Sequence, residues 1–203
     1  MPRSLVVALT AAALVLAAPT VASAATAVPS LPSGADQAFL ADGDGNPIHS
    51  TSTLSGSFNK TYGSGLVLTC SGTATITTKD DGTSSTTAFN ATTGTCSTNV
   101  PTCIAHIAGS NLDWGSIQAF ISSVYRWYTN VDYSVQLTSG CPVVGTFSET
   151  GTLSPTIAVA SGVLTETYSG ASSGTVTGPL GSSSLSGTLT STSGVPSDAQ
   201  LIH

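Results

Sequence analysis

Residues 65–78 read GLVLTCSGTATITT, and this stretch decides the fold class. Apolar or small residues recur at every second position from Leu66 to Ile76, and Ser and Thr occupy most of the positions between them. A period of two is typical of a β-strand with one face in the core and the other in solvent. Thr is itself a good strand former and suits the solvent face. The stretch therefore predicts an all-β protein.

The four cysteines predict two disulfides, because an even count in an exported chain is typical of a crosslinked domain. The turn cluster at 79–82 reverses the chain after the first strand, and a hairpin about it places Cys70 opposite Cys96. Directly opposed residues have Cα atoms about 4.5 Å apart, which a disulfide can bridge. We therefore expect Cys70–Cys96 and Cys103–Cys141, with Cys96–Cys103 and Cys70–Cys141 as the alternative.

The rest of the chain continues in short alternating segments separated by Gly- and Ser-rich turns. We expect an antiparallel sandwich or barrel of about eight to ten short strands, stapled by the two disulfides. One short helix is expected from Asn111, which can cap it, to a point near Tyr125, because apolar residues recur there at helical spacing. A strand beginning at Ser123 is the alternative for the end of this segment.

The N-terminus has the parts of a secretory signal peptide over residues 1–24: Arg3, an apolar run, and small residues at Ala22 and Ala24. We expect a secreted protein, extracellular or in the cell envelope, without an integral membrane segment after signal cleavage. Residues 25–50 are expected to be a flexible lead-in and residues 51–192 a single β domain. Residues 193–203 are expected to be a loose C-terminal tail.

Charge is scarce and mostly negative. Outside the predicted signal peptide, the basic residues are Lys60, Lys79 and Arg126, against ten carboxylates in the chain. A nucleic-acid backbone needs a clustered basic surface, so nucleic acid is excluded as a partner. No Cys-x-x-Cys pair occurs, so we expect neither a metal nor a cofactor.

Two motifs match catalytic or metal-binding patterns only in part. The stretch 170–174 reads GASSG and matches G-x-S-x-G around Ser172, but no helix is predicted after it, as a nucleophile elbow requires. Asp42, Asp44 and Asn46 have the opening spacing of a calcium loop, whose later Gly and Glu are missing. His106 has apolar neighbours and is expected to be a partly buried strand residue.

The carboxylates are the remaining candidates for acid–base chemistry. Glu149 and Glu166 are isolated in predicted strands, and a glycosidase needs two carboxylates that face each other across a cleft. Their pairing does not follow from the sequence. No catalytic residue is therefore assigned, although a secreted hydrolase is kept as an alternative function.

Half of the aromatic residues lie within residues 114–133. Exposed rings beside a cation can stack on a sugar or anchor a protein partner, so we take Tyr125, Arg126, Trp127 and Tyr128 as a candidate contact site. The alternative is that these rings fill the core.

The sequence favours a non-catalytic binding or interaction module, whose partner is an unidentified extracellular protein or a carbohydrate. A small β-barrel that binds an apolar ligand is another alternative, and it predicts an enclosed cavity of about 300 Å3 or more.

Overall fold

The computed structural model describes residues 27–91, 95–108, 114–170, 173–176 and 179–203, so the predicted signal peptide lies outside the described residues. These residues are all-β and contain no helix. The strands are β1 (Asp36–Gln37), β2 (Phe39–Ala41), β3 (Ser50–Tyr62), β4 (Val67–Thr78), β5 (Thr83–Ala91), β6 (Thr95–Thr98), β7 (Ala105–Ala108), β8 (Trp114–Ile121), β9 (Val124–Leu137), β10 (Gly145–Leu153), β11 (Thr156–Ala160), β12 (Val163–Ser169), β13 (Ser173–Val176), β14 (Ser183–Ser193) and β15 (Gln200–Ile202).

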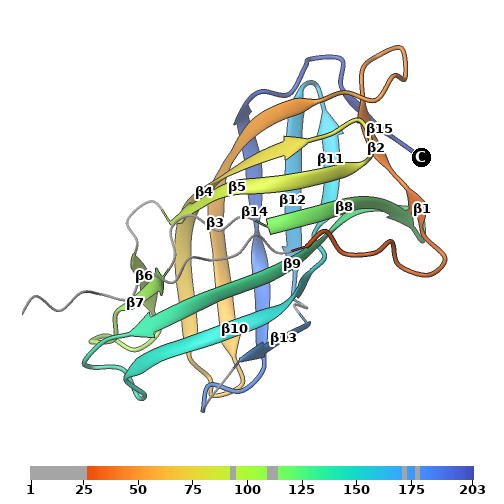
Figure 1. Cartoon of the computed structure of the whole chain (residues 1–203). Helices are drawn as coiled ribbons and strands as arrows, with labels where there is room; N and C mark the ends of the chain where they lie inside the picture. Colours follow the sequence, from red (N-terminus) through yellow and green to blue (C-terminus); the bar gives the residue numbers. More distant parts are fainter. Residues whose placement is uncertain (1–26, 92–94, 109–113, 171–172, 177–178) are drawn as a thin grey trace, which may run out of the picture.

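All strands except β2 and β15 form one antiparallel sheet that closes on itself (Figure 1). Strand β3 pairs with β4 along one edge and with β14 along the other. At one end of the molecule the pairings run from β4 through β5, β8, β9, β11 and β12 to β14. At the other end they run through β6, β7, β9, β10 and β13. The architecture is therefore a barrel rather than an open sandwich.

The predicted alternation decides which side chains point inward. In β4, Leu68, Cys70, Ala74 and Ile76 are buried, and the residues between them are more exposed. Strand β3 follows the same rule, with its even-numbered positions buried toward its C-terminal end. The barrel interior is therefore built from alternate residues of each strand, as the period of two requires.

The predicted short helix is wrong: residues 114–121 form strand β8, and Asn111 lies outside the described residues. The chain turns back after Ile121 through Ser122 and Ser123, whose φ angles of 52° and 63° are left-handed. A two-residue turn of this kind matches the twist of a β-hairpin. Strand β8 is buried on both faces over most of its length, which explains why its apolar residues do not alternate.

Both expected disulfides are present, and the predicted connectivity is confirmed. Cys70 and Cys96 have Cα atoms 4.5 Å apart, and Cys103 and Cys141 have theirs 4.2 Å apart. The register that places Cys70 opposite Cys96 is provided by the short strand β6, in which Ser97 faces Thr69. Strand β5 pairs with β4 in a different register and also bends at a bulge. Strands β5 and β6 therefore pair with β4 in two different registers, rather than as one continuous hairpin.

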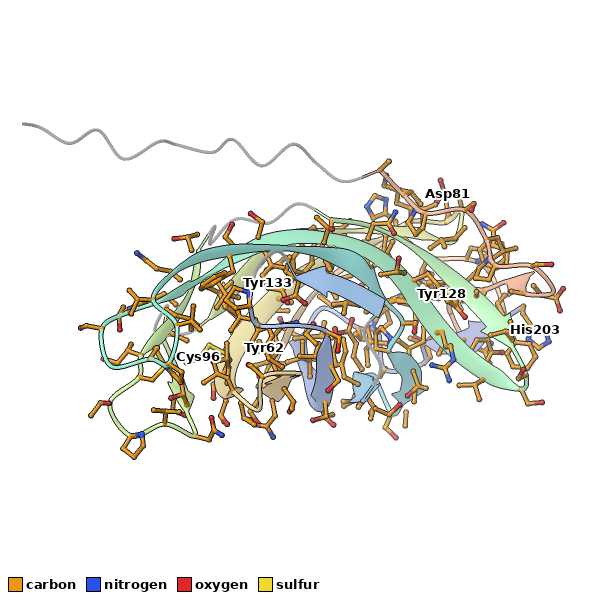
Figure 2. The ribbon with its side chains drawn as sticks, turned by 90° about the horizontal axis from the view of Figure 1, so that it is seen from below. Tyr62, Asp81, Cys96, Tyr128, Tyr133 and His203 are labelled. Atoms are coloured by element: carbon orange, nitrogen blue, oxygen red, sulfur yellow. A yellow bond between two sulfur atoms is a disulfide. The ribbon has the colours of Figure 1, made fainter. Side chains whose placement is uncertain are left out.

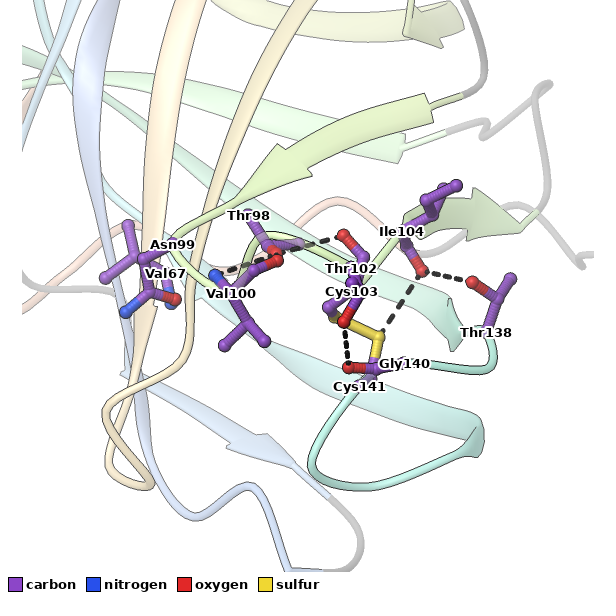
Figure 3. Close-up of a disulfide and its surroundings, with 10 residues drawn as sticks. All are labelled: Val67, Thr98, Asn99, Val100, Thr102, Cys103, Ile104, Thr138, Gly140 and Cys141. Atoms are coloured by element: carbon purple, nitrogen blue, oxygen red, sulfur yellow. Dashed lines mark hydrogen bonds between the residues drawn. A yellow bond between two sulfur atoms is a disulfide. The ribbon is translucent and has the colours of Figure 1, made fainter.

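The Cys103–Cys141 bridge ties the loop before β7 to the loop after β9 (Figure 3). Thr138 donates a hydrogen bond from its hydroxyl to the Ile104 carbonyl at 3.1 Å, and Thr102 donates one to the Gly140 carbonyl at 3.2 Å. These bonds hold the two loops together beside the disulfide.

Strands also form in the predicted lead-in and tail. Strand β2 pairs with β15, so residues near both termini of the described chain meet at one end of the barrel (Figure 1). The His203 ring stacks on Phe120, with ring centroids 3.7 Å apart. The sequence signal for these strands is weak because each is only two or three residues long.

The interior holds two main apolar clusters, one toward each end of the barrel. The first surrounds the disulfides and includes Leu68, Cys70 and Leu137. The second lies toward β2 and β15 and includes Leu54, Trp127 and Leu189. The described part of the chain contains no helix with the length and hydrophobicity that crossing a bilayer requires.

Candidate functional site

Three charged side chains of the described residues are buried inside the barrel: Lys60, Glu149 and Glu166. The Lys60 ammonium of β3 lies 2.5 Å from the Glu149 carboxylate of β10, and both side chains are almost fully buried. Ser183 of β14 donates a hydrogen bond to the same carboxylate at 2.6 Å. Buried ions are costly unless paired, so this contact is what allows a lysine and a glutamate inside the barrel.

Two tyrosines flank this ion pair, and Figure 2 shows both between the strands of the barrel. The Lys60 Nζ atom lies 5.7 Å from the Tyr62 ring centroid and 5.2 Å from that of Tyr133. Burial lowers the pKa of Lys60, and the Glu149 charge opposes this shift. Burial and the nearby Glu149 raise the pKa of both tyrosines. The phenols therefore remain protonated at neutral pH.

A second carboxyl group, Glu166 of β12, is buried in the interior without a basic partner. The Tyr168 hydroxyl donates a hydrogen bond to its Oε2 atom at 2.8 Å. Burial raises the pKa of Glu166 from its usual 4.5 to about 7, although the Tyr168 hydrogen bond lowers it. Within the described ranges, no Lys, Arg or His forms an ion pair with this group. Glu166 therefore exchanges its proton close to neutral pH.

The free energy of unfolding of Glu166→Gln, relative to that of the wild type, is expected to increase as the pH rises. The folded protein keeps the Glu166 proton up to pH 7 or so, while the unfolded chain loses it near 4.5. The wild-type group therefore contributes less stability as pH rises through this window, by about 3 kcal/mol in all, and glutamine removes this loss. Urea unfolding at pH 4.5, 6 and 8 measures the difference between variant and wild type.

Asp198→Asn is the matched control, since Asp198 is an exposed carboxylate. The free energy of unfolding of Asp198→Asn, measured at the same pH values, is the baseline for that of Glu166→Gln. A Glu166→Gln difference that stays constant from pH 4.5 to 8 would contradict the account of this residue.

A cavity of about 60 Å3 inside the barrel is lined by residues of both apolar clusters. Its wall is mostly apolar and includes rings from several strands: Phe58, Trp114, Trp127, Tyr133 and Tyr168. Polar groups also line it, namely Lys60, Glu166 and the Ser116–Thr129 pair, whose hydroxyl oxygens are 2.7 Å apart. Among the described residues, no group accepts a hydrogen bond from the buried Trp127 indole N–H. A mainly apolar cavity with a few converging polar groups is the usual form of a small-molecule site.

The four residues of the predicted contact site lie on two different faces of β9. Trp127 points into the barrel and is only 2% exposed. Tyr125 packs against Phe120, and its hydroxyl lies 3.1 Å from Nδ1 of His203. Arg126 and Tyr128 alternate with these two residues, and Arg126 donates a hydrogen bond to the Ser154 carbonyl at 2.9 Å. The structure therefore does not bring the four together as one exposed surface.

The other candidate motifs that fall within the described residues do not come together either. Ser172 lies outside the described residues, and His106 is half-buried on β7. The Asp42 carboxylate accepts hydrogen bonds from the backbone N–H groups of Asp44 and Asn46, at 3.1 and 2.8 Å. These contacts stabilise the turn that contains Asp42. In the part of the chain that the structure describes, no three His, Cys, Asp or Glu side chains gather as metal ligands would.

Sequence reasoning missed Lys60, although a signal for it exists. Residues 58, 60 and 62 share one face of β3, and Phe58 and Tyr62 identify that face as the buried one. A lysine between two inward aromatic residues indicates a buried charge, which needs a partner.

Comparisons of the chain with protein-family models, with curated proteins and with solved structures find no match.

Proposed function

We propose that this is an exported, non-catalytic binding protein, and that its site is the cavity inside the barrel. The observation that carries the proposal is the cavity itself, whose wall combines aromatic rings with Glu166 and Trp127. The buried Trp127 indole N–H has no acceptor among the described residues. A buried donor without an acceptor costs stability in an empty site, and a bound molecule can satisfy it. The two disulfides support the expected export.

The size of the cavity limits the ligand. Its volume of about 60 Å3 is well below the 300 Å3 or so expected for a drug-sized ligand. It corresponds to roughly two water molecules. The barrel as it stands therefore accepts a compact molecule or the head group of a longer one, and a larger ligand requires the interior side chains to move apart.

Xenon provides an apolar probe of this site, because it enters apolar protein cavities. We expect xenon under pressure to shift the NMR signal of the Trp127 indole N–H in a saturable manner. Ala74→Val adds two methyl groups to the cavity wall and should abolish this shift. Ala158→Val is the matched control, since Ala158 is exposed on β11 and the same change there leaves the cavity free. A Trp127 signal insensitive to xenon, or one equally sensitive in Ala74→Val, would overturn the proposal.

A further inference from the structure

We propose that the cavity takes a compact organic ammonium ion, held by the Glu166 carboxylate and by the aromatic rings around it. This inference rests on the proposed function and names the chemical class of its ligand.

The charge balance of the barrel interior favours a cationic ligand. Among the described residues, the Lys, Arg, Asp and Glu side chains that are buried are Lys60, Glu149 and Glu166. Lys60 and Glu149 neutralise each other in their ion pair. Glu166 remains, and among the described residues it has no cationic partner. Ionisation of Glu166 therefore gives the interior a net negative charge, which a cationic ligand neutralises.

The aromatic composition of the cavity wall also favours a cation. Trp114, Trp127 and Tyr168 line the same cavity as Glu166. The faces of such rings attract an ammonium group, most strongly where water is excluded. The Ser116 and Thr129 hydroxyl oxygens also line the cavity and provide further acceptors for ammonium N–H groups. The carboxylate, the aromatic rings and the hydroxyl oxygens favour a cation over an anion, and the Lys60 charge on the same wall is neutralised by Glu149.

The groups around Glu166 determine how binding depends on pH. The neighbouring strands present Ile157 and Leu189 opposite it, neither of which titrates. The titratable groups that share its cavity are Lys60 of β3, Tyr133 of β9 and Tyr168 of β12. Lys60 is held by Glu149, and the pKa values of both tyrosines lie well above 10. Burial raises the pKa of Glu166 to about 7, so its carboxyl group changes charge between pH 5 and 8.

The test compares ethylammonium with ethanol, which have similar sizes and differ in charge. Titrations followed through the Trp127 indole N–H signal should show ethylammonium binding at least tenfold more tightly than ethanol at pH 8. Affinity should fall about tenfold per pH unit below the Glu166 pKa, since the carboxyl must lose its proton to hold the cation. Probes of this size bind weakly, on the order of 1 mM at best, so NMR is the suitable method.

Glu166→Gln separates charge recognition from simple filling of the cavity. The variant keeps the size of the side chain, and it should lose the preference for ethylammonium while still admitting xenon. Asp198→Asn should keep the preference, because Asp198 is an exposed carboxylate. Equal affinities for ethylammonium and ethanol in a protein that binds xenon would overturn this inference and leave the proposed function standing. Exclusion of xenon from the wild-type protein would instead overturn the proposed function.

Discussion

Lys60→Met is expected to lower the free energy of unfolding by about 3–5 kcal/mol, because it leaves the Glu149 carboxylate buried and unpaired. Glu149→Leu should cost a similar amount for the same reason, with the Lys60 ammonium now unpaired. The double variant Lys60→Met/Glu149→Leu should recover most of this loss, since replacing a buried ion pair by apolar side chains of similar volume is often neutral. Urea unfolding of the three variants and the wild type gives the coupling energy directly.

Lys79→Met is the control for this cycle. Lys79 is an exposed residue in the turn between β4 and β5, and its loss should leave stability unchanged within error. Additive effects of the two interior substitutions would contradict the account, because additivity means that the two buried groups do not interact.

Removal of both disulfides should unfold the barrel under conditions in which the oxidised protein is stable. The bridges close loops of 26 and 38 residues. Loop-closure entropy assigns them about 3.5 and 4 kcal/mol, and their sum is comparable to the total stability of a typical domain. Circular dichroism during thermal unfolding, with and without reductant, measures the effect.

The two bridges can be removed separately as matched controls. Cys70→Ala/Cys96→Ala and Cys103→Ala/Cys141→Ala should each remain folded at low temperature and unfold at lower temperature than the wild type. Unchanged unfolding temperatures in both pair variants, together with an unchanged one in the reduced protein, would show that the crosslinks do not support the barrel.

The local part of the fold could be predicted from the sequence, because it depends on neighbouring residues. The alternation in 65–78 identifies β4 and its buried face. The Cys70–Cys96 pairing was also predicted correctly, although strand β6, and not one continuous hairpin, provides its register. The helix prediction failed because strand β8 is buried on both faces and loses its period of two. The turn at Ser122 and Ser123 also lacks the Asn-Gly or Asp-Gly signal that usually identifies a two-residue hairpin.

The candidate site depends on contacts between distant strands, which the sequence does not show. The alternation of β3 can place Lys60 inside, but its pairing with Glu149 joins residues that are 89 positions apart. Closure of the sheet into a barrel also places Glu166 and Trp127 in the wall of one cavity. Trp127 belongs to the aromatic cluster of the sequence, and its ring lies inside the barrel rather than on an exposed surface.

The most direct test of the account is the NMR titration of the Glu166 side-chain carboxyl carbon, with and without saturating ethylammonium. We predict a pKa of about 7 in the free protein and a value below the usual 4.5 in the complex, because the bound cation stabilises the carboxylate. A Glu166 pKa that is near 4.5 in the free protein, or that ethylammonium leaves unchanged, would contradict it.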